Sequence, residues 1–389
     1  MPKLMVLAAL LLCAGVDASR QRQLPLGEFR DKLAGGWVGQ MVGVSYGSVY
    51  EFRAVGSTYD GPIREWQPEF ISNALGQDDL YVEMTFLMSL DKHGVGVSQR
   101  QAALDFAGSQ YALWHANRWG RDNIRKGIMP PASGHPRFNL HADDIDFQIE
   151  ADLFGLVCPG LPQASNRLCD RFGHLMNYGD GVYGGMFVAA CYTAAYFERD
   201  VEKVVRSGLS AIPSRSRYAA VIRDVLAWYR ENPGDWRQTW RKLESKWAGE
   251  DKCPDGAGKP FNIDAKMNGA YVVIALLYGG GDFEKTMEIA VRCGQDADCN
   301  ASSAAGILGT ILGYKRIPER FTAGLREIRG RNFAYTPYSF DTLAAVCERI
   351  AKDIVRGEGG QVIRRGGREV LLIAVQAPKP PQRLEQWVD

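Results

Sequence analysis

Residues 293–313 read CGQDADCNASSAAGILGTILG, and no other stretch says as much about how the chain folds. Two carboxylates, Asp296 and Asp298, precede a run of small residues that predicts a tightly packed helix over residues 299–312. One aspartate at a helix start is ordinary capping, because free N–H groups and a partial positive charge meet it there. Two carboxylates in one Asp-x-Asp turn repel each other, and a cation would remove that repulsion. The motif by itself leaves capping and metal binding open.

A glycine pattern near the N-terminus predicts a second tightly packed helix. Within residues 29–47, glycine recurs at every fourth position, as Gly35, Gly39, Gly43 and Gly47. On a helix these positions share one face, where another backbone can approach closely because only hydrogen atoms project. A glycine inside an ordinary helix costs roughly 1 kcal/mol relative to alanine. We therefore expect close packing or a ligand to offset this cost.

A second acidic turn, Gly76-Gln77-Asp78-Asp79, leads into an apolar helix expected at 79–90. Both carboxylates of such a pair can reach one ion from the first turn of a helix, although the pair alone favours a solvated cap. Hard divalent cations such as Mg²⁺ are held by carboxylates and water from separate chain segments. Together with the Asp296–Asp298 turn, this pair therefore predicts a metal site.

The chain shows helical periodicity throughout its length and little strand alternation. A loop rich in Arg, Gly and Pro is expected at 117–138, and Gly279-Gly280-Gly281 should end a long apolar helix. The predicted helices are 29–47, 79–90, 101–115, 143–157, 178–197, 201–210, 217–231, 235–247, 262–278, 283–293 and 299–312. These elements predict an all-α fold.

The pattern changes beyond residue 356. Residues 361–363 and 370–375 are expected to be two β-strands around a Gly-Gly turn, and a Pro-rich end follows. We therefore predict one helical domain over 22–355, with a short β-hairpin and Pro-rich tail over 356–389.

Charge and the N-terminal segment bear on partners and location. The chain has 46 basic and 45 acidic residues, so it lacks the basic footprint of a protein that binds a nucleic-acid polymer or an anionic membrane. Residues 1–19 combine Lys3, a short apolar run and small residues ending at Ser19, which predicts a signal peptide. We therefore expect export to the periplasm or the extracellular space.

The cysteines do not indicate a zinc knuckle or a thioredoxin-type site, because none forms a Cys-x-x-Cys pair. Of the 8 cysteines, Cys13 lies in the predicted signal peptide. Export permits disulfides, and Cys158 and Cys169 are close enough in sequence to form one. The odd number that remains leaves at least one free thiol, and the pairing is open.

The carboxylates Asp144, Asp146 and Asp180 are candidates for substrate binding. Asp144 and Asp146 lie near His141, and Glu150 shares a helical face with Asp146. This group is either a solvated acidic helix start or an acid/base or ribose-binding cluster that faces the metals. Asp180 stands in a Gly-rich turn and is either a turn residue or a substrate contact.

The expected loop at 117–138 contributes Arg121, Asn123 and Trp119 as candidates for substrate binding. Loops that a rigid scaffold positions often carry binding residues. Here arginine side chains could hold a phosphate or a sugar, and Trp119 could stack on a sugar ring. The alternatives are a surface loop with salt bridges and a tryptophan that belongs to the core.

These motifs resemble the ADP-ribosylglycohydrolase family over most of residues 28–325. The resemblance rests on KLAGGWVG at residues 32–39, on the Asp78–Asp79 turn and on residues 293–313. It implies a compact, orthogonal multi-helix fold and a divergent, exported member of the family. It further implies a magnesium centre whose metals bind ribose hydroxyls and a water beside the scissile glycosidic bond.

Carried over by position, the resemblance gives four metal ligands: Asp78, Asp79, Asp296 and Asp298. Asp79 or Asp296 would also act as the catalytic base. The implied activity is a metal-dependent glycosidase that cleaves a bond to a ribose-like sugar, in an ADP-ribosyl, riboside or furanoside substrate. The partner is thus a small molecule or glycan with such a sugar.

Four positions depart from the family pattern. Gln77 and Leu80 replace threonines around the first acid pair, Cys299 replaces a threonine or serine ligand, and Gln40 replaces an aspartate. A thiol is a poor partner for magnesium. The centre is therefore expected to hold one or two ions, Mg²⁺ or alternatively Mn²⁺ or another divalent cation. A non-catalytic sugar- or nucleotide-binding relative is the alternative function.

Overall fold

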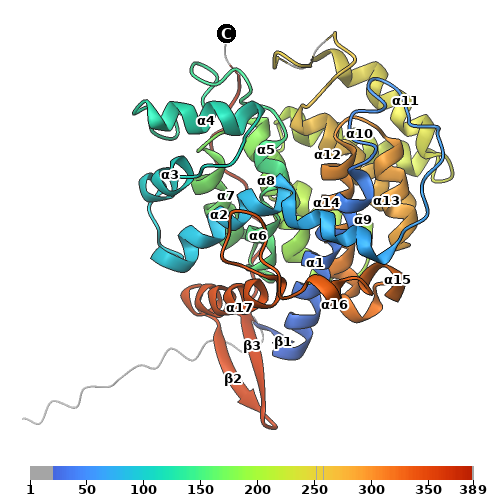
Figure 1. Ribbon diagram of the computed structural model, residues 1–389. Helices are drawn as coiled ribbons and strands as arrows, with labels where there is room; N and C mark the ends of the chain where they lie inside the picture. The colour runs from blue at the N-terminus through green and yellow to red at the C-terminus, as the bar shows by residue number, and fades with distance from the viewer. Residues whose placement is uncertain (1–20, 251, 257, 388–389) are drawn as a thin grey trace, which may run out of the picture.

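The structure is a computed structural model that describes residues 21–250, 252–256 and 258–387. The predicted signal peptide, residues 1–19, lies outside the described residues. The described chain is mostly helical and carries one small sheet, which projects at the lower end of the molecule in Figure 1. The predicted all-α fold with a small β appendage is therefore confirmed.

The helices of the first half are α1 (Leu26–Gly47), the 3₁₀ segment η2 (Pro68–Gly76), α2 (Asp78–His93), α3 (Gln99–Ala107), α4 (His115–Arg125), α5 (Asp146–Ile149), α6 (Asp152–Leu156), α7 (Pro162–Gly173) and α8 (Asp180–Ala195). Those of the second half are α9 (Val201–Ser210), α10 (Arg217–Glu231), α11 (Trp236–Trp247), η3 (Ala248–Glu250), α12 (Ala265–Gly279), α13 (Phe283–Arg292), α14 (Ala297–Leu312), η4 (Tyr314–Arg316), α15 (Glu319–Thr322), α16 (Leu325–Ile328) and α17 (Phe340–Gly357). The strands are β1 (Gln21–Pro25), β2 (Gln361–Arg365) and β3 (Arg368–Ala374).

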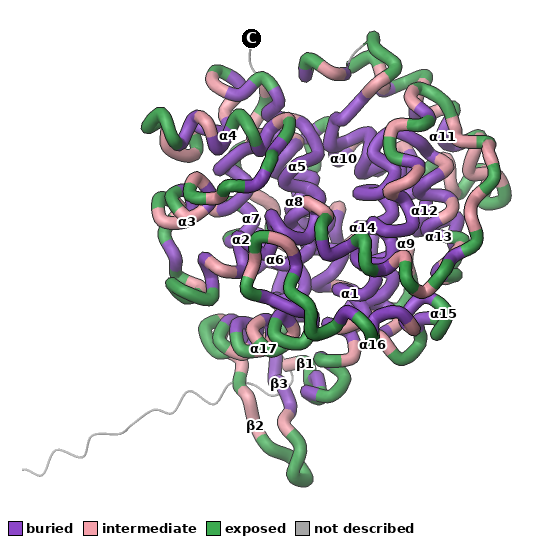
Figure 2. The backbone as a smooth tube through the Cα atoms, viewed as in Figure 1, coloured by how far each residue is buried: buried purple, intermediate pink, exposed green. Residues whose placement is uncertain are grey.

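Helices α1 and α14 lie at the centre of the molecule and are buried along most of their length (Figure 2). Their backbones touch along the glycine stripe of α1. A methyl group at Gly39 would overlap the carbonyl of Ala305, and one at Gly47 would overlap the backbone of Asp298. Close backbone packing therefore explains the stripe. It also fixes the start of α14, where the acidic turn lies, against the end of α1.

The expectation of a loop over the whole of 117–138 is wrong, because residues 115–125 form α4. A side chain from a distant segment accepts hydrogen bonds from the free N–H groups at the start of this helix. Asp146 accepts hydrogen bonds from the backbone N–H of Asn117, at 2.9 Å, and of Ala116, at 3.3 Å. Such a cap stabilises a helix that its own sequence favours only weakly.

Other predicted helices are close to those observed, with local differences. The helix expected at 143–157 is broken into α5 and α6, and the one expected at 101–115 ends early, at the close of α3. Helices α7 and α17 were not predicted. Gly280 adopts a left-handed conformation, with φ of 63°, and ends α12 as expected.

The sheet has the strand order β1-β3-β2, and both pairings are antiparallel. Strands β2 and β3 are the predicted hairpin, and their turn uses Gly366 and Gly367, both with positive φ. Strand β1 was not predicted. It pairs with β3 from Gln21 opposite Ala374 to Pro25 opposite Val370. The two ends of the helical domain are thus joined through β3.

The C-terminal segment, residues 375–387, leaves the sheet and runs along α7 and α8. The Asn166 side chain donates to the Lys379 carbonyl at 3.2 Å. Farther along, the Glu385 carboxylate accepts from His174 Nε2 at 3.1 Å and from the Gly179 N–H at 3.2 Å. The segment is therefore attached to the same turn that holds Asp180.

The cysteines that the structure describes are all free and buried. The suggested Cys158–Cys169 disulfide is therefore not formed, and both thiols lie in the hydrophobic core. Within the described residues, no helix is both long enough and apolar enough to cross a membrane.

Candidate functional site

A cavity of about 280 Å³ opens where the N-termini of α2 and α14 meet. Its lining combines carboxylates with aromatic and aliphatic side chains. The lining residues are Glu51, Phe52, Gly76, Gln77, Asp78, Tyr81, Trp114, His115, Asn117, Ile145, Asp146, Ile149, Ile263, Asp296, Asp298 and Cys299.

The two acidic turns, far apart in the sequence, converge at this cavity. The Cys299 thiol, in the first turn of α14, donates to Asp79 Oδ2 at 3.4 Å. Asp79 is fully buried, and Asp296 and Asp298 are each 4% exposed. The structure thus brings Asp78, Asp79, Asp296 and Asp298 together, as the sequence analysis expected.

Capping does not account for the Asp296 side chain. Asp296 occupies the N-cap position of α14, yet its side chain makes no capping hydrogen bond. Among the described residues, no group donates to the buried Oδ1 atoms of Asp79, Asp296 and Asp298. Buried polar atoms are normally hydrogen-bonded, so these buried carboxylate oxygens are suited to hold a cation.

The electrostatics of the four acids agree with this interpretation. Burial, reinforced by Asp298, raises the pKa of Asp78 to about 6. Burial and the neighbouring carboxylates raise the pKa of Asp79 and of Asp296 well above the usual range, and burial also raises that of Asp298. The protein alone therefore disfavours charge on these groups, whereas a divalent cation would favour it.

The side chains that could ligate an ion here are carboxylates, which suit a hard cation, and one thiol, which does not. One ligand atom each from Asp296, Asp298 and Cys299 lie within 4.8 Å of one another. Burial and the Asp296 carboxylate raise the pKa of the Cys299 thiol well above its usual value, so it stays protonated there. The Gln77 side chain also lines the cavity, whereas Leu80 and Gln40 are fully buried and are not part of its lining.

Glu51 is a cavity residue that the sequence analysis missed. It lies four residues beyond the glycine stripe, in a turn with no motif of its own. Loss of hydration in the cavity, together with Asp298 and Asp78, raises the pKa of Glu51 to about 7. Such a group can hold or release a proton near neutral pH. Only the close approach of the end of α1 to α14 could have suggested it.

Asp146 and Glu150 act as structural acceptors, and of the two only Asp146 lines the cavity. Asp146 lines the cavity while it caps α4, and Glu150 accepts a short hydrogen bond from the Asn117 side chain. Asp144 lies deeper and is fully buried. Its Oδ2 lies 2.5 Å from His141 Nδ1 and 3.6 Å from His115 Nδ1. His115, a second residue that the sequence analysis missed, lines the cavity.

The remaining predicted substrate residues lie outside the lining of this cavity. Arg121 donates to the Tyr111 carbonyl at 2.7 Å, and Asn123 donates to the carbonyls of Ser133 and Phe138 at 2.9 and 2.8 Å. These hydrogen bonds hold α4 and the turns beside it. Trp119 is 40% exposed, and its ring centroid lies 6.1 Å from that of His141.

Asp180 belongs to a different cavity, of about 460 Å³. Its Oδ2 accepts the backbone N–H of Tyr218 at 3.2 Å, which connects the start of α8 to α10. Asp180 thus stabilises the start of α8 and also lines this second cavity.

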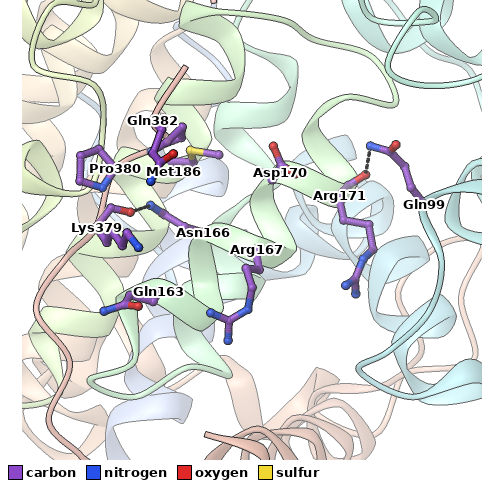
Figure 3. Close-up of a pocket in the computed structure, with 11 residues that line it drawn as sticks. Gln99, Gln163, Asn166, Arg167, Asp170, Arg171, Met186, Lys379, Pro380 and Gln382 are labelled. Carbon is purple, nitrogen blue, oxygen red and sulfur yellow. Dashed lines mark hydrogen bonds between the residues drawn. The ribbon is translucent and has the colours of Figure 1, made fainter. Parts of the chain in front are cut away.

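A larger cavity, of about 610 Å³, lies between α7 and the C-terminal segment (Figure 3). Two of its basic groups are already engaged elsewhere. Arg171 donates to the Val95 carbonyl at 2.8 Å, and Arg167 forms an ion pair with Glu358. Asp170 is the only carboxylate among its lining residues. The two acidic turns line the smaller cavity instead.

Comparisons with known proteins agree on one family. The sequence pattern of the ADP-ribosylglycohydrolase family matches residues 26–359. Among solved structures, the fold is similar to an "ADP-ribosylglycohydrolase-related protein complex", with a TM-score of 0.53 and 17% sequence identity, over 84% of this chain and 99% of that chain. No curated protein matches the chain significantly. Because the family pattern spans most of its length, the chain belongs to the ADP-ribosylglycohydrolase family.

Proposed function

We propose that the acidic cavity hydrolyses a glycosidic bond to a ribose-like sugar with the help of divalent metal. Membership of the family supports a glycohydrolase-type activity. The observation that carries the metal dependence is the convergence of Asp78, Asp79, Asp296 and Asp298, three of which keep a buried oxygen without a donor among the described residues. Mg²⁺ is the proposed ion, because carboxylate oxygens are its preferred protein ligands.

The protein's own groups would move the protons. A bound divalent cation would supply positive charge that orients the sugar hydroxyls and eases deprotonation of a water. Asp79 or Asp296 accepts the water proton as the water oxygen bonds to the anomeric carbon. The glycosidic bond breaks in the same step, through an oxocarbenium-like state. Glu51, which starts protonated, gives its proton to the leaving group. The base then loses the water proton to solvent and Glu51 regains one, so that both groups return to their starting states.

The dimensions of the cavity favour a small substrate. A volume of about 280 Å³ accommodates one sugar ring and part of a leaving group. Phe52 and Trp114 stand beside the acids, and Trp114 is 53% exposed. We propose ribosides, ADP-ribose derivatives or other furanosides as substrates. Export, proposed from residues 1–19, would present such small molecules to the enzyme.

A chelator-sensitive hydrolysis assay tests this proposal. Purified protein is incubated with nucleosides, ADP-ribose and aryl furanosides, with Mg²⁺ or with excess chelator. Hydrolysis of at least one substrate should require metal and should be abolished in Asp296→Asn. Glu231→Gln, which removes an exposed acid paired with Lys242, is the matched control and should keep full activity.

The assay also separates the alternative function. A non-catalytic relative would bind one of these compounds in the cavity, in a calorimetric titration, without turnover. Turnover that persists in chelator and in Asp296→Asn would remove the metal mechanism.

A further inference from the structure

A second group of metal-ligating side chains lies beside the acidic cavity. It consists of His115, His141 and Asp144, and we call it the histidine–aspartate cluster. One ligand atom from each residue lies within 4.8 Å of the others. His115 comes from the start of α4, whereas the other two come from the turn before α5. None of them is among the four acids proposed to bind magnesium.

Both imidazoles direct the same nitrogen at the same carboxylate oxygen. His141 Nδ1 and His115 Nδ1 lie 2.5 and 3.6 Å from Asp144 Oδ2. Asp144 is fully buried, His141 is 9% exposed, and His115 is half-buried at the cavity wall. Two imidazole nitrogens and a carboxylate oxygen at one point form a donor set that a divalent transition metal can use.

Neighbouring side chains hold the turn that carries His141 and Asp144. The Asn177 side chain donates to the carbonyls of Ala142 and Asp144, both at 2.8 Å. Asn139 donates to the Met176 carbonyl at 2.7 Å. Ligands on a segment fixed in this way keep their geometry without the ion, which is the arrangement of a prepared binding site.

The backbone at His115 is also held in an unusual conformation. His115 has φ of 36°, in the left-handed region that non-glycine residues seldom adopt. Its ring stacks on Phe261, with centroids 6.1 Å apart, and meets the His141 ring edge-on at 5.3 Å. Strain of this kind persists where the surroundings impose it, often at functional sites.

The donor set differs in kind from that of the acidic centre. Imidazole nitrogen suits borderline transition metals such as Zn²⁺ and Co²⁺, whereas Mg²⁺ prefers oxygen. Two histidines and one carboxylate leave a coordination position for water or substrate, as in open zinc sites. Asp255 Oδ2, 3.9 Å from His115 Nδ1, is near enough to supply a further oxygen.

We propose that His115, His141 and Asp144 bind a divalent transition-metal ion, in addition to the magnesium centre. Because His115 also lines the acidic cavity, an ion at this cluster would lie beside that cavity. The inference rests on the cluster alone and does not depend on the proposed hydrolysis.

A cobalt titration tests the site without any substrate. The full chain is freed of metal with chelator, transferred to excess Mg²⁺ and titrated with CoCl₂, while visible absorption and calorimetry are followed. We expect Co²⁺ to bind despite the excess Mg²⁺, with the absorption of a low-coordinate nitrogen and oxygen site. This binding should be lost in His115→Ala and His141→Ala. It should persist in Asp296→Asn, and in His93→Ala, which removes a histidine that pairs with Asp105 elsewhere.

Two results would overturn the site. One is wild-type protein that takes up no Co²⁺ in excess Mg²⁺, and the other is uptake that persists when His115 and His141 are both replaced. A strong sulfur-to-cobalt band would place the ion at Cys299 and would equally contradict the proposal. If the histidine variants do not fold, X-ray absorption of the cobalt-loaded wild type decides, since imidazole scattering supports the site and its absence excludes it.

Discussion

Gly47 lies directly against the backbone of Asp298, so closely that a methyl group on Gly47 would overlap the Asp298 Cα. This contact is the last of the glycine stripe of α1, and it places the acidic turn of α14 at the cavity. The packing of two central helices therefore determines the position of a proposed metal ligand. Stability and the site are coupled through this contact.

Gly47→Ala should consequently impair the site as well as the fold. The added methyl group must push Asp298 away, at a cost of about 1–3 kcal/mol in the free energy of unfolding, which is typical of overpacking. We expect weaker Mg²⁺ binding and a loss of activity at temperatures where the variant is still folded. Calorimetric Mg²⁺ titration and thermal unfolding measure the two effects.

Gly27→Ala is the matched control in the same helix. No atom lies within 4 Å of the place where its methyl group would stand. Because Gly27 lies in the first turn, we expect this substitution to stabilise the protein by at most about 1 kcal/mol and to leave Mg²⁺ binding unchanged. Equal metal affinities in Gly47→Ala and the wild type would show that the contact does not position Asp298.

The metal-free protein should lose stability as the pH rises. Folded-state pKa values of about 6 for Asp78 and about 7 for Glu51 lie above the ordinary values of 3.8 and 4.5. Their contribution is therefore fully present below about pH 4 and is lost as the pH rises through 6 and 7. We expect the melting temperature in chelator to fall between about pH 5 and about pH 8.

Two comparisons check this pH dependence. Asp78→Asn should show a shallower fall in melting temperature, because one of the titrating groups is gone. Mg²⁺ should raise the melting temperature more at pH 8 than at pH 5, since only ionised carboxylates bind it. A melting temperature in chelator that is independent of pH would contradict the raised pKa values of Asp78 and Glu51.

The sequence predicted the parts of the site that have local patterns and missed the parts that depend on tertiary contacts. The Asp-x-Asp turn and the glycine stripe are local patterns, and both elements were predicted close to their observed positions. The convergence of Asp79 with Cys299, 220 residues apart, followed only from pairing the two acidic turns as ligands of one ion. Glu51 and His115 carry no local pattern, because tertiary packing alone brings them to the cavity.

The errors have a similar origin. The residues of α4 resemble a loop because the helix takes its cap from Asp146, about 30 residues away. Strand β1 is too short for a recognisable alternation and is defined by its partner β3. Arg121 was expected to face substrate as part of a loop, whereas within α4 it serves a backbone carbonyl. For α4 and β1, a long-range contact decided what local sequence left open.

Attachment of the C-terminal segment should depend on pH. Burial acts to lower the pKa of His174, but the Glu385 carboxylate and the Asp170 carbonyl raise it above 6.5. Burial acts to raise the pKa of Glu385, but His174 lowers it below 4.5. The contribution of His174 is present below pH 6.5 and is lost as the pH rises through its folded pKa. The contribution of Glu385 is present above pH 4.5 and is lost as the pH falls through its folded pKa.

We expect residues 375–387 to be protected most between these values and proteolysed faster at alkaline pH. Glu385→Gln should remove the difference, and its persistence in that variant would exclude the pair as its cause.

Replacing the thiol at the acidic cavity tests the interpretation of Cys299. A hydroxyl is a better ligand for Mg²⁺ than a protonated thiol, and Cys299→Ser changes one atom while it keeps a donor for Asp79. We expect Mg²⁺ to bind about fivefold more tightly, which is roughly 1 kcal/mol.

Cys293→Ser is the control, because the Cys293 thiol is buried outside the cavity lining and belongs to the same turn. Calorimetry of both variants in parallel measures the effect. If serine at 299 leaves the affinity unchanged, or if both variants change it equally, the side chain at 299 does not contact the ion, and the ligand set is limited to the carboxylates.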